Sequence, residues 1–461
     1  MSSHAAAPTA PDPNSPMGTV SDYIAGALAA PLPAAVVEKS KHHLLDTLSA
    51  MVSGSRLKPG IMAAEFVAGL GGTPIATVVG TQNVTSPVNA AFANGMMAHA
   101  DETDDSHVPS LTHPGCGVVS AALAAAELKH ASGNDLLRAV ALGYDFCARS
   151  TLALGPEAIR AESRSSHTFG PTFGAAAASG ALLGLNAAQV RYLLSYTLQQ
   201  AGGVDCWARD KEHIEKAFDF GGMGARNGLT AAMLAAAGFT GVDDIFSGEK
   251  NFFTAYASKP DPGALTRDLG TNFEIMNTNI KRWCVGTPIQ AALDALLIII
   301  ERDGLTPDNL DVLKVTIHAS GAKTVNDRTI PDISLQYLLS VMLIDKGLTF
   351  ASAHDHDRMS DPNVLAIKKR IELTGDPSLD SNPNRQAIMS ITTRDGRTLN
   401  EHVTKVRGTA GNPMERAEVE LKSFDLLSPV IGDARAKALI KLVWNIENVK
   451  DVAELRPLLQ A

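Results

Sequence analysis

Acidic and imidazole side chains are concentrated in one short segment of this chain. Between His99 and His113, four carboxylates and three imidazoles fall within fifteen residues. They are Asp101, Glu102, Asp104 and Asp105, with His99, His107 and His113. Holding so many like charges close together costs free energy unless they are paired with opposite charges or take part in binding or catalysis. Three interpretations are open: a solvated loop whose aspartates cap helices, a metal site, or a site that binds substrate and transfers protons.

A second histidine lies in a glycine-flanked segment. His167 follows Ser165 and Ser166, and it precedes Gly170 and Gly174. We expect these glycines to bracket a turn into an Ala-rich helix that begins near residue 172. The free N–H groups of that helix could bind a carboxylate. His167 is therefore either a structural residue or a second proton-transfer group.

Cationic residues mark two further candidates. Lys216 precedes a glycine-rich segment at 221–228 that lacks the order of a P-loop and follows no strand. We interpret this segment as a tight turn that either packs helices or binds a ligand. Lys281 and Arg282 lie at an expected domain junction, where they could bind a carboxylate or simply be exposed. The segment from His354 to Arg358 has no partner spacing for a metal, so we expect a solvated loop.

The elements that must position these residues are mostly helical. Apolar residues recur every three to four positions, and Ala and Gly are frequent on the packing faces. This pattern predicts helices at 36–52, 88–100, 117–131, 135–154, 172–183, 187–201 and 224–237. One short strand is expected at 74–79. The candidate residues then lie at the ends of helices or in the loops between them.

The pattern changes near residue 281. Residues 313–318 alternate like a strand, and 386–393 and 398–406 flank Asp395-Gly396, which is a strong hairpin signal. Helices are expected at 288–302, 335–346, 363–371, 415–427 and 433–446. We therefore expect a mainly α fold, with a large all-helical domain at 18–268 and 408–461. A smaller α+β lid domain occupies 269–407, and residues 1–17 form a disordered tail.

Composition excludes several classes of protein. The 461-residue chain has a formal net charge of −9 and no basic block, which argues against nucleic-acid binding. Its four cysteines form no Cys-x-x-Cys pair, so a zinc ribbon is not expected and an iron–sulfur cluster has little support. No apolar run is long enough to span a membrane, and we interpret the first seventeen residues as a disordered tail, not as a signal peptide. We expect a cytoplasmic protein without membrane contacts.

The candidate segments, taken in order, resemble the MmgE/PrpD family. The resemblance runs over nearly the whole chain and includes five segments. They are Asn94-Gly95 to His113-Pro114, Ser166-His167, Lys216 before Gly-x-Gly-Ala-Arg-Asn-Gly, Lys281-Arg282-x-Cys284, and Leu335-Gln336-Tyr337. The resemblance implies a helical domain joined to an α+β domain, a homodimer, and an active site in the cleft between the domains.

The family chemistry implied by this resemblance is proton transfer next to a carboxylate, without a metal or an organic cofactor. We expect a lyase that acts on a small di- or tricarboxylic acid, with a hydro-lyase like 2-methylcitrate dehydratase as the first choice. Decarboxylation, as by cis-aconitate decarboxylase, and epimerisation, as by iminodisuccinate epimerase, are the alternatives. A metal-dependent hydrolase and a catalytically silent binding protein are alternatives of another class.

The resemblance also assigns roles to single residues. His113 and His167 would be the proton-handling pair, and Lys216 and Lys281, with Arg282 behind, would bind substrate carboxylate. The remaining candidates would orient an imidazole or contact the substrate: Asp101, Asp104, Asp105, Ser106, His107 and, as a hydrogen-bond donor, Tyr337. The chain departs from the family where Asp219-Phe220-Gly221-Gly222 replaces a segment that often carries histidine. Fewer cations favour a substrate with fewer carboxylates than citrate.

Overall fold

The computed structural model describes residues 12–380 and 385–461, and its chain divides into two compact units. The first unit comprises residues 1–100, 109–276 and 441–461, and the second comprises 101–108 and 277–440. This division differs from the predicted domains at three places, because 101–108 and 408–440 group with the second unit and 269–276 group with the first. Of the predicted tail, residues 1–11 lie outside the described residues. Residues 16 and 17 already belong to a helix.

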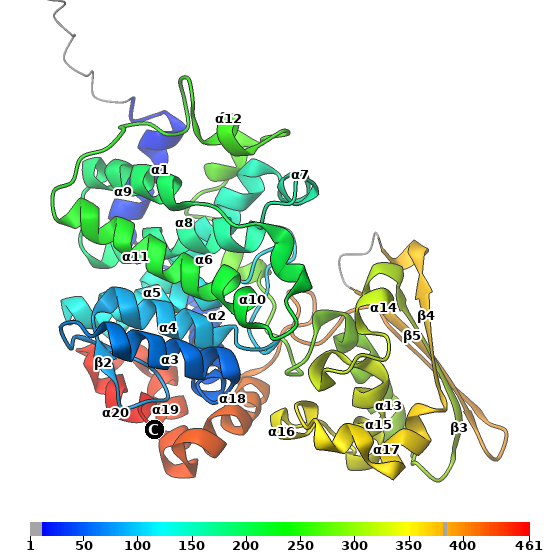
Figure 1. Ribbon diagram of the computed structural model, residues 1–461. Helices are drawn as coiled ribbons and strands as arrows, with labels where there is room; N and C mark the ends of the chain where they lie inside the picture. The colour runs from blue at the N-terminus through cyan, green and yellow to red at the C-terminus, as the bar shows by residue number, and fades with distance from the viewer. Residues whose placement is uncertain (1–11, 381–384) are drawn as a thin grey trace, which may run out of the picture. The chain divides into compact units, whose positions relative to one another are not determined.

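The first unit is built almost entirely from helices (Figure 1). Only a two-stranded antiparallel ribbon interrupts them in the described part, β1 (Ala76–Thr77) with β2 (Val84–Thr85). The helices are α1 (Pro16–Gly26), α2 (Ala34–Gly54), α3 (Lys58–Leu70), α4 (Pro87–Ala98), α5 (Pro114–Lys129), α6 (Gly133–Leu154), α7 (Pro156–Ala161), α8 (Ser166–Leu182), α9 (Ala187–Gln200), α10 (Ile214–Ala217), α11 (Met223–Ala236), α12 (Phe252–Tyr256) and α20 (Arg456–Leu459). Helix α19 (Asp433–Trp444) crosses the boundary between the units.

Small residues allow the central helices to lie close together. Helices α5 and α8 are buried along nearly their whole length, and α8 contacts α5, α6 and α11. A Cβ atom on Gly174 of α8 would lie 2.5 Å from the carbonyl oxygen of Gly143 on α6, which no side chain tolerates. The Ala- and Gly-rich composition therefore creates the contact surface of this core.

Two predictions about glycine-rich segments were wrong. Helix α8 begins at Ser166, six residues before the predicted start, so Gly170 and Gly174 lie inside a helix and bracket no turn. The segment before α11 is also helical, as a π-helical stretch from Phe218 to Gly222. In both places glycine serves close packing, because the missing side chain admits a neighbouring backbone.

The second unit contains a four-stranded sheet with the order β4-β3-β5-β6. Strands β3 (Leu310–His318) and β4 (Ile371–Asp376) are parallel, and the other pairs, with β5 (Ala387–Thr393) and β6 (Thr398–Val403), are antiparallel. The predicted Asp395-Gly396 hairpin is confirmed, with Leu399 opposite Ile391. Strand β4 was not predicted, and the predicted helix at 363–371 ends at Lys368, just before this strand.

Helices cover this sheet and complete the α+β unit. Helix α13 (Gln290–Asp303) contacts β5 and β6, and α15 (Leu335–Asp345) packs on α13 and on α17 (Pro362–Lys368). The unit also holds α14 (Ala319–Val325), α16 (Phe350–Ala353) and α18 (Arg416–Ile431). Alternate residues of β5 enter the core, as the period of a strand requires. The predicted fold class, mainly α with a smaller α+β part, is confirmed.

Candidate active site

The acidic and histidine-rich segment is shared between the two units. His99 follows the last residue of α4 and His113 directly precedes the first residue of α5, so both histidines belong to the helical unit. The residues between 101 and 108 belong to the second unit. The candidate groups therefore form two sets, an imidazole cluster and an acidic loop, which are described separately.

Three imidazoles surround one phenylalanine in the helical unit, and a fourth lies beside one of the three. The rings of His99 and His167 stack on Phe220, with centroid distances of 4.2 Å and 3.9 Å. His113 lies 5.4 Å from His167 and 5.0 Å from His99, and His213 lies 5.1 Å from His99, all between ring centroids. The structure thus brings together the predicted pair His113 and His167. It adds His99, His213 and Phe220, to which the sequence analysis gave no role.

Local backbone structure explains how Phe220 reaches these rings. It lies in the π-helical stretch that leads into α11. A π-turn inserts an extra residue and re-aims the side chains around it, which is common at functional sites. A Cβ atom on Gly95 of α4 would lie 2.6 Å from the carbonyl oxygen of Gly221, so both elements approach closely only because these positions are glycine.

Burial determines the protonation state of His167. Burial lowers the pKa of His167 well below its ordinary value, and the nearby His113, Lys216 and His99 lower it further. Its ring is therefore neutral at pH 7 and able to accept a proton. The Nδ1 atom of His167 is buried without a hydrogen-bond partner in the described part of the chain. A ring nitrogen in that state is suited to contact a substrate.

A lysine and a carboxyl group complete the cluster. The Lys216 ammonium lies 5.1 Å from the centroid of the Phe220 ring and 5.6 Å from that of Trp207. Asp219 is buried, and this burial raises its pKa to about 6, although the Ser165 hydroxyl donates to it. Asp219 therefore titrates near neutral pH, a property typical of functional carboxyl groups. In the sequence, Asp219 stands out only as part of a segment that departs from the family.

These imidazoles are also the residues of the helical unit that could bind a metal ion. His99 lies next to both His113 and His213, and imidazole is a common ligand of zinc and related metals. The same arrangement suits proton transfer. The prediction of a site that needs no metal and no cofactor stays a prediction.

In the acidic loop, charged partners balance the carboxylates. The Nε2 atom of His354 lies 2.8 Å from the Asp101 carboxylate, and the Thr103 hydroxyl donates to the same group at 2.6 Å. The Lys281 ammonium lies 3.3 Å from the carboxylate of Glu102 and 3.9 Å from that of Asp104. Ion pairing resolves the crowding of like charges that the sequence displays.

Two pKa shifts record the pairing of Asp101 with His354. Burial favours the neutral form of Asp101, but the hydrogen bonds from His354 and Thr103 and the charge of His354 lower its pKa. Burial likewise favours a neutral His354, but Asp101, with Asp332 nearby, raises its pKa to about 9. At neutral pH the pair is ionised on both sides.

The structure corrects the interpretation of the segment around His354. We expected a solvated loop, but the His354 side chain is only 16% exposed and its ring stacks on Phe350. The Tyr337 hydroxyl holds this segment, donating to the carbonyl groups of Ser352 at 2.7 Å and Asp355 at 3.1 Å. The structure therefore gives Tyr337 a role in holding the His354 segment. Its predicted contact with substrate stays a prediction.

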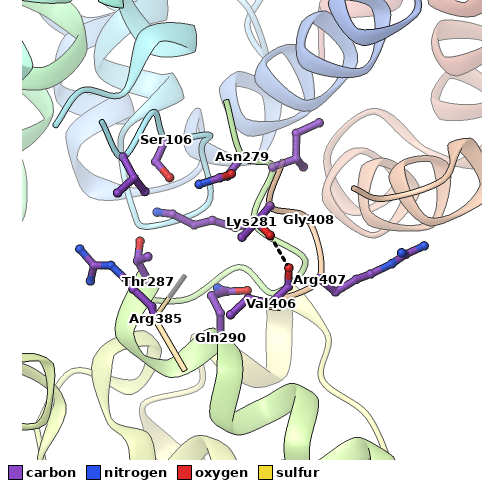
Figure 2. Close-up of a pocket in the computed structure, with 12 residues that line it drawn as sticks. Ser106, Asn279, Lys281, Thr287, Gln290, Arg385, Val406, Arg407 and Gly408 are labelled. Carbon is purple, nitrogen blue, oxygen red and sulfur yellow. Dashed lines mark hydrogen bonds between the residues drawn. The ribbon is translucent and has the colours of Figure 1, made fainter. Parts of the chain in front are cut away.

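A pocket of the second unit lies beside Lys281 (Figure 2). It encloses about 380 Å³, part of it open to solvent, and its walls include Ser106, Thr287 and Arg385. The predicted cation Arg282 is absent from these walls. Its guanidinium group lies 4.7 Å from the centroid of the Trp283 ring and 3.5 Å from the Asp294 carboxylate. Asp105 and His107 are fully buried in the loop that carries Ser106.

Comparison with known families decides the relationship. The sequence model of the MmgE/PrpD N-terminal domain matches residues 18–264, and that of the MmgE/PrpD C-terminal domain matches 283–448. The chain belongs to the MmgE/PrpD family. The resemblance seen in the sequence is thereby confirmed.

Curated members of the MmgE/PrpD family match over nearly the full chain. Cis-aconitate decarboxylase of Homo sapiens is 27% identical over 455 residues, covering 92% of this chain and 90% of the human protein. The cis-aconitate decarboxylase-like protein oryM of Aspergillus oryzae is 26% identical and covers 93% and 94%. The enzyme of Mus musculus is 25% identical. No helix among the described residues has the length and apolar character needed to span a membrane.

Proposed function

We propose that this protein is a lyase that acts on a small di- or tricarboxylic acid by proton transfer next to a carboxylate, without a cofactor. One observation carries the proposal: His113 and His167 lie together around Phe220, with the Lys216 ammonium 5.1 Å from the same ring. A proton acceptor, a proton donor and a cation are the groups that this chemistry needs.

Each group has a distinct role in the proposed reaction. The neutral His167 ring accepts a proton from the carbon next to a carboxylate, and its lowered pKa keeps it unprotonated beforehand. Lys216 stabilises the negative charge that develops on that carboxylate. His113 donates a proton to the leaving group or to the product carbon. Lys281 binds a second carboxylate, and the acidic-loop residues Asp101, Asp104 and Asp105, with Ser106 and His107, shape its surroundings.

Decarboxylation is the first reaction to test. The curated relatives that cover nine-tenths of the chain are named as cis-aconitate decarboxylases. In such a step the bond to one carboxyl carbon breaks, carbon dioxide leaves, and the remaining electron pair takes a proton from the imidazolium form of His113. Dehydration, which was the first expectation from the sequence, and epimerisation also need His167 to remove a proton from carbon, so the products decide among the three reactions.

A product screen tests the proposal. The purified protein is incubated with cis-aconitate, citrate, 2-methylcitrate and iminodisuccinate, with and without EDTA, and products are identified by mass spectrometry. We expect turnover of at least one acid at an unchanged rate in EDTA. Turnover of none would contradict the proposal and favour a silent binding protein. Activity that EDTA abolishes and a stoichiometric metal restores would favour the metal-dependent hydrolase.

Two expectations from the family resemblance accompany this proposal. We expect a homodimer in solution and a cytoplasmic location. Light scattering coupled to size-exclusion chromatography measures the first, and a mass equal to one chain would contradict it. Fractionation of the native cells measures the second.

A further inference from the structure

Two helices at the surface of the helical unit have apolar outer faces, and α3 is the first of them. Its exposed side chains include Ile61, Met62, Phe66 and Leu70, of which Phe66 is 56% and Leu70 57% exposed. A surface helix normally turns charged and polar side chains toward water. The outer face of α3 therefore has the composition of a surface that contacts another protein surface.

Helix α11 has the same property. Its glycine-rich side packs on α8, since a Cβ atom on Gly228 would lie 2.6 Å from the backbone nitrogen of Ala176. Within this fully described helix, Arg226 is the only charged residue among those that are not buried. The others are Met223, Thr230, Met233, Leu234 and Ala236. The outward side of α11 is thus almost as apolar as that of α3.

Aromatic contacts connect the two helices through α4. The ring centroid of Phe92 on α4 lies 5.7 Å from that of Phe66 and 6.3 Å from that of Phe218. The guanidinium carbon of Arg226 lies 5.8 Å from the centroids of both Phe92 and Phe218. Helix α4 contacts α3 and α11, and the three helices lie side by side (Figure 1). We call the combined surface the α3–α11 face; it comprises Ile61, Met62, Glu65, Phe66, Leu70, Phe92, Met223, Arg226, Thr230 and Met233.

The charges on the α3–α11 face are complementary to each other. Within the described part of the chain, no carboxylate pairs with the guanidinium group of Arg226, which donates to the Asn227 side chain, and no cation pairs with Glu65. Lys58, at the start of α3, pairs instead with Glu212. A face that carries one such charge of each sign can meet its own copy across a two-fold axis. A membrane surface would require a cluster of cations, which this face lacks.

We propose that the α3–α11 face binds a second copy of this chain, with Arg226 of one protomer paired to Glu65 of the partner subunit. Methionine, aromatic residues and arginine are enriched in protein interfaces, and aromatic residues and arginine often supply most of the binding energy. The inference gives the expected homodimer a specific contact surface, and it does not depend on the proposed reaction.

Analytical ultracentrifugation of the full-length protein over a range of concentrations tests the surface. For Leu70→Glu we expect the dissociation constant of the dimer to rise at least roughly a hundredfold, because the carboxylates would be buried among apolar side chains. Leu421→Glu is the matched control, since this leucine of α18 is 72% exposed and lies outside the α3–α11 face, so the variant should dimerise like the wild type. A monomeric wild type, or a Leu70→Glu variant that dimerises like the wild type, would overturn the inference.

Charge exchange tests the proposed ion pair. Glu65→Arg and Arg226→Glu each place like charges opposite one another, so each should weaken the dimer at least roughly tenfold. The double variant restores opposite charges and should dimerise more tightly than either single variant. Circular dichroism verifies that all three variants are folded. A double variant no tighter than the single variants would overturn the pairing of Arg226 with Glu65.

The interface and the proposed reaction fail separately. A dimer that depends on Leu70 but turns over no acid would refute the reaction and leave the interface standing. A monomer that turns over one of the acids would refute the interface alone.

Discussion

The imidazole of His354 lies 2.8 Å from the carboxylate of Asp101 and joins the acidic loop to the segment that follows α15. The two residues are far apart in sequence, and both are largely enclosed. Lys422 adds a second attachment, donating to the carbonyl group of Thr103 at 3.0 Å. The loop that carries Glu102 and Asp104 toward Lys281 is therefore anchored from several directions.

The His354–Asp101 pair should give stability a specific pH dependence. The pKa of His354 rises from its ordinary 6.5 to about 9 on folding, so its contribution is complete below pH 6.5 and is lost as pH rises through 9. The shift corresponds to on the order of 3 kcal/mol. Urea unfolding between pH 6 and 10 should show wild type losing more stability than His354→Gln. Parallel curves for the two proteins would contradict the pairing.

Removal of the proposed base should abolish most activity without unfolding the protein. His167→Gln keeps a polar side chain on Phe220 but cannot accept a proton, so kcat should fall by roughly a hundredfold to ten-thousandfold. His130→Gln is the matched control, because that side chain is 75% exposed at the end of α5. Steady-state kinetics and circular dichroism measure both variants. A His167→Gln enzyme with wild-type kcat would exclude His167 as the base.

The Lys216 ammonium should matter for the transition state more than for substrate binding. In Lys216→Gln we expect kcat to fall by about a hundredfold or more, because the carboxylate charge loses its preorganised cation. KM should change less than kcat. An effect confined to KM would instead place Lys216 in ground-state binding.

The ionised Asp219 carboxylate should lower the stability of the protein while supporting its activity. Its pKa rises from 3.8 to about 6 on folding because the ionised form is buried, so the wild type loses stability as pH rises from 4 to 6. Asp219→Asn removes this charge and should be on the order of 2–3 kcal/mol more stable at pH 7 but less active. Thermal unfolding at pH 5 and pH 7 measures the difference. A variant less stable than wild type at both pH values would contradict this.

Local patterns in the sequence predicted much of this fold. Helical periodicity gave 135–154 for α6, which runs from Gly133 to Leu154, and Asp395-Gly396 marked the hairpin of β5 and β6. The predicted start of helix α8 was too late, because glycine usually indicates a turn. Here Gly170 and Gly174 allow close packing inside a helix, a use that depends on partners distant in sequence.

The candidate site was predicted only in part, for a similar reason. His113, His167 and Lys216 stand in segments that resemble family motifs, and the structure places them around one ring. The partners of the acidic loop come from elsewhere in the chain, so no local pattern pointed to His354. His213 had a usable signal, since it lies three residues before Lys216. Arg385 had none, because only the folded chain brings it to the wall of the pocket.

The most direct test of the account is the isotope content of the product. EDTA-treated wild-type protein is given cis-aconitate, or another acid whose conversion adds a proton to carbon, in heavy water, and the product is analysed by mass spectrometry and NMR. The account predicts one deuterium on the carbon next to a carboxylate, at a rate that His113→Gln, which lacks the proton donor, reduces at least a hundredfold. Product without deuterium, or deuterium incorporated equally fast by His113→Gln, would contradict proton transfer by the imidazole cluster.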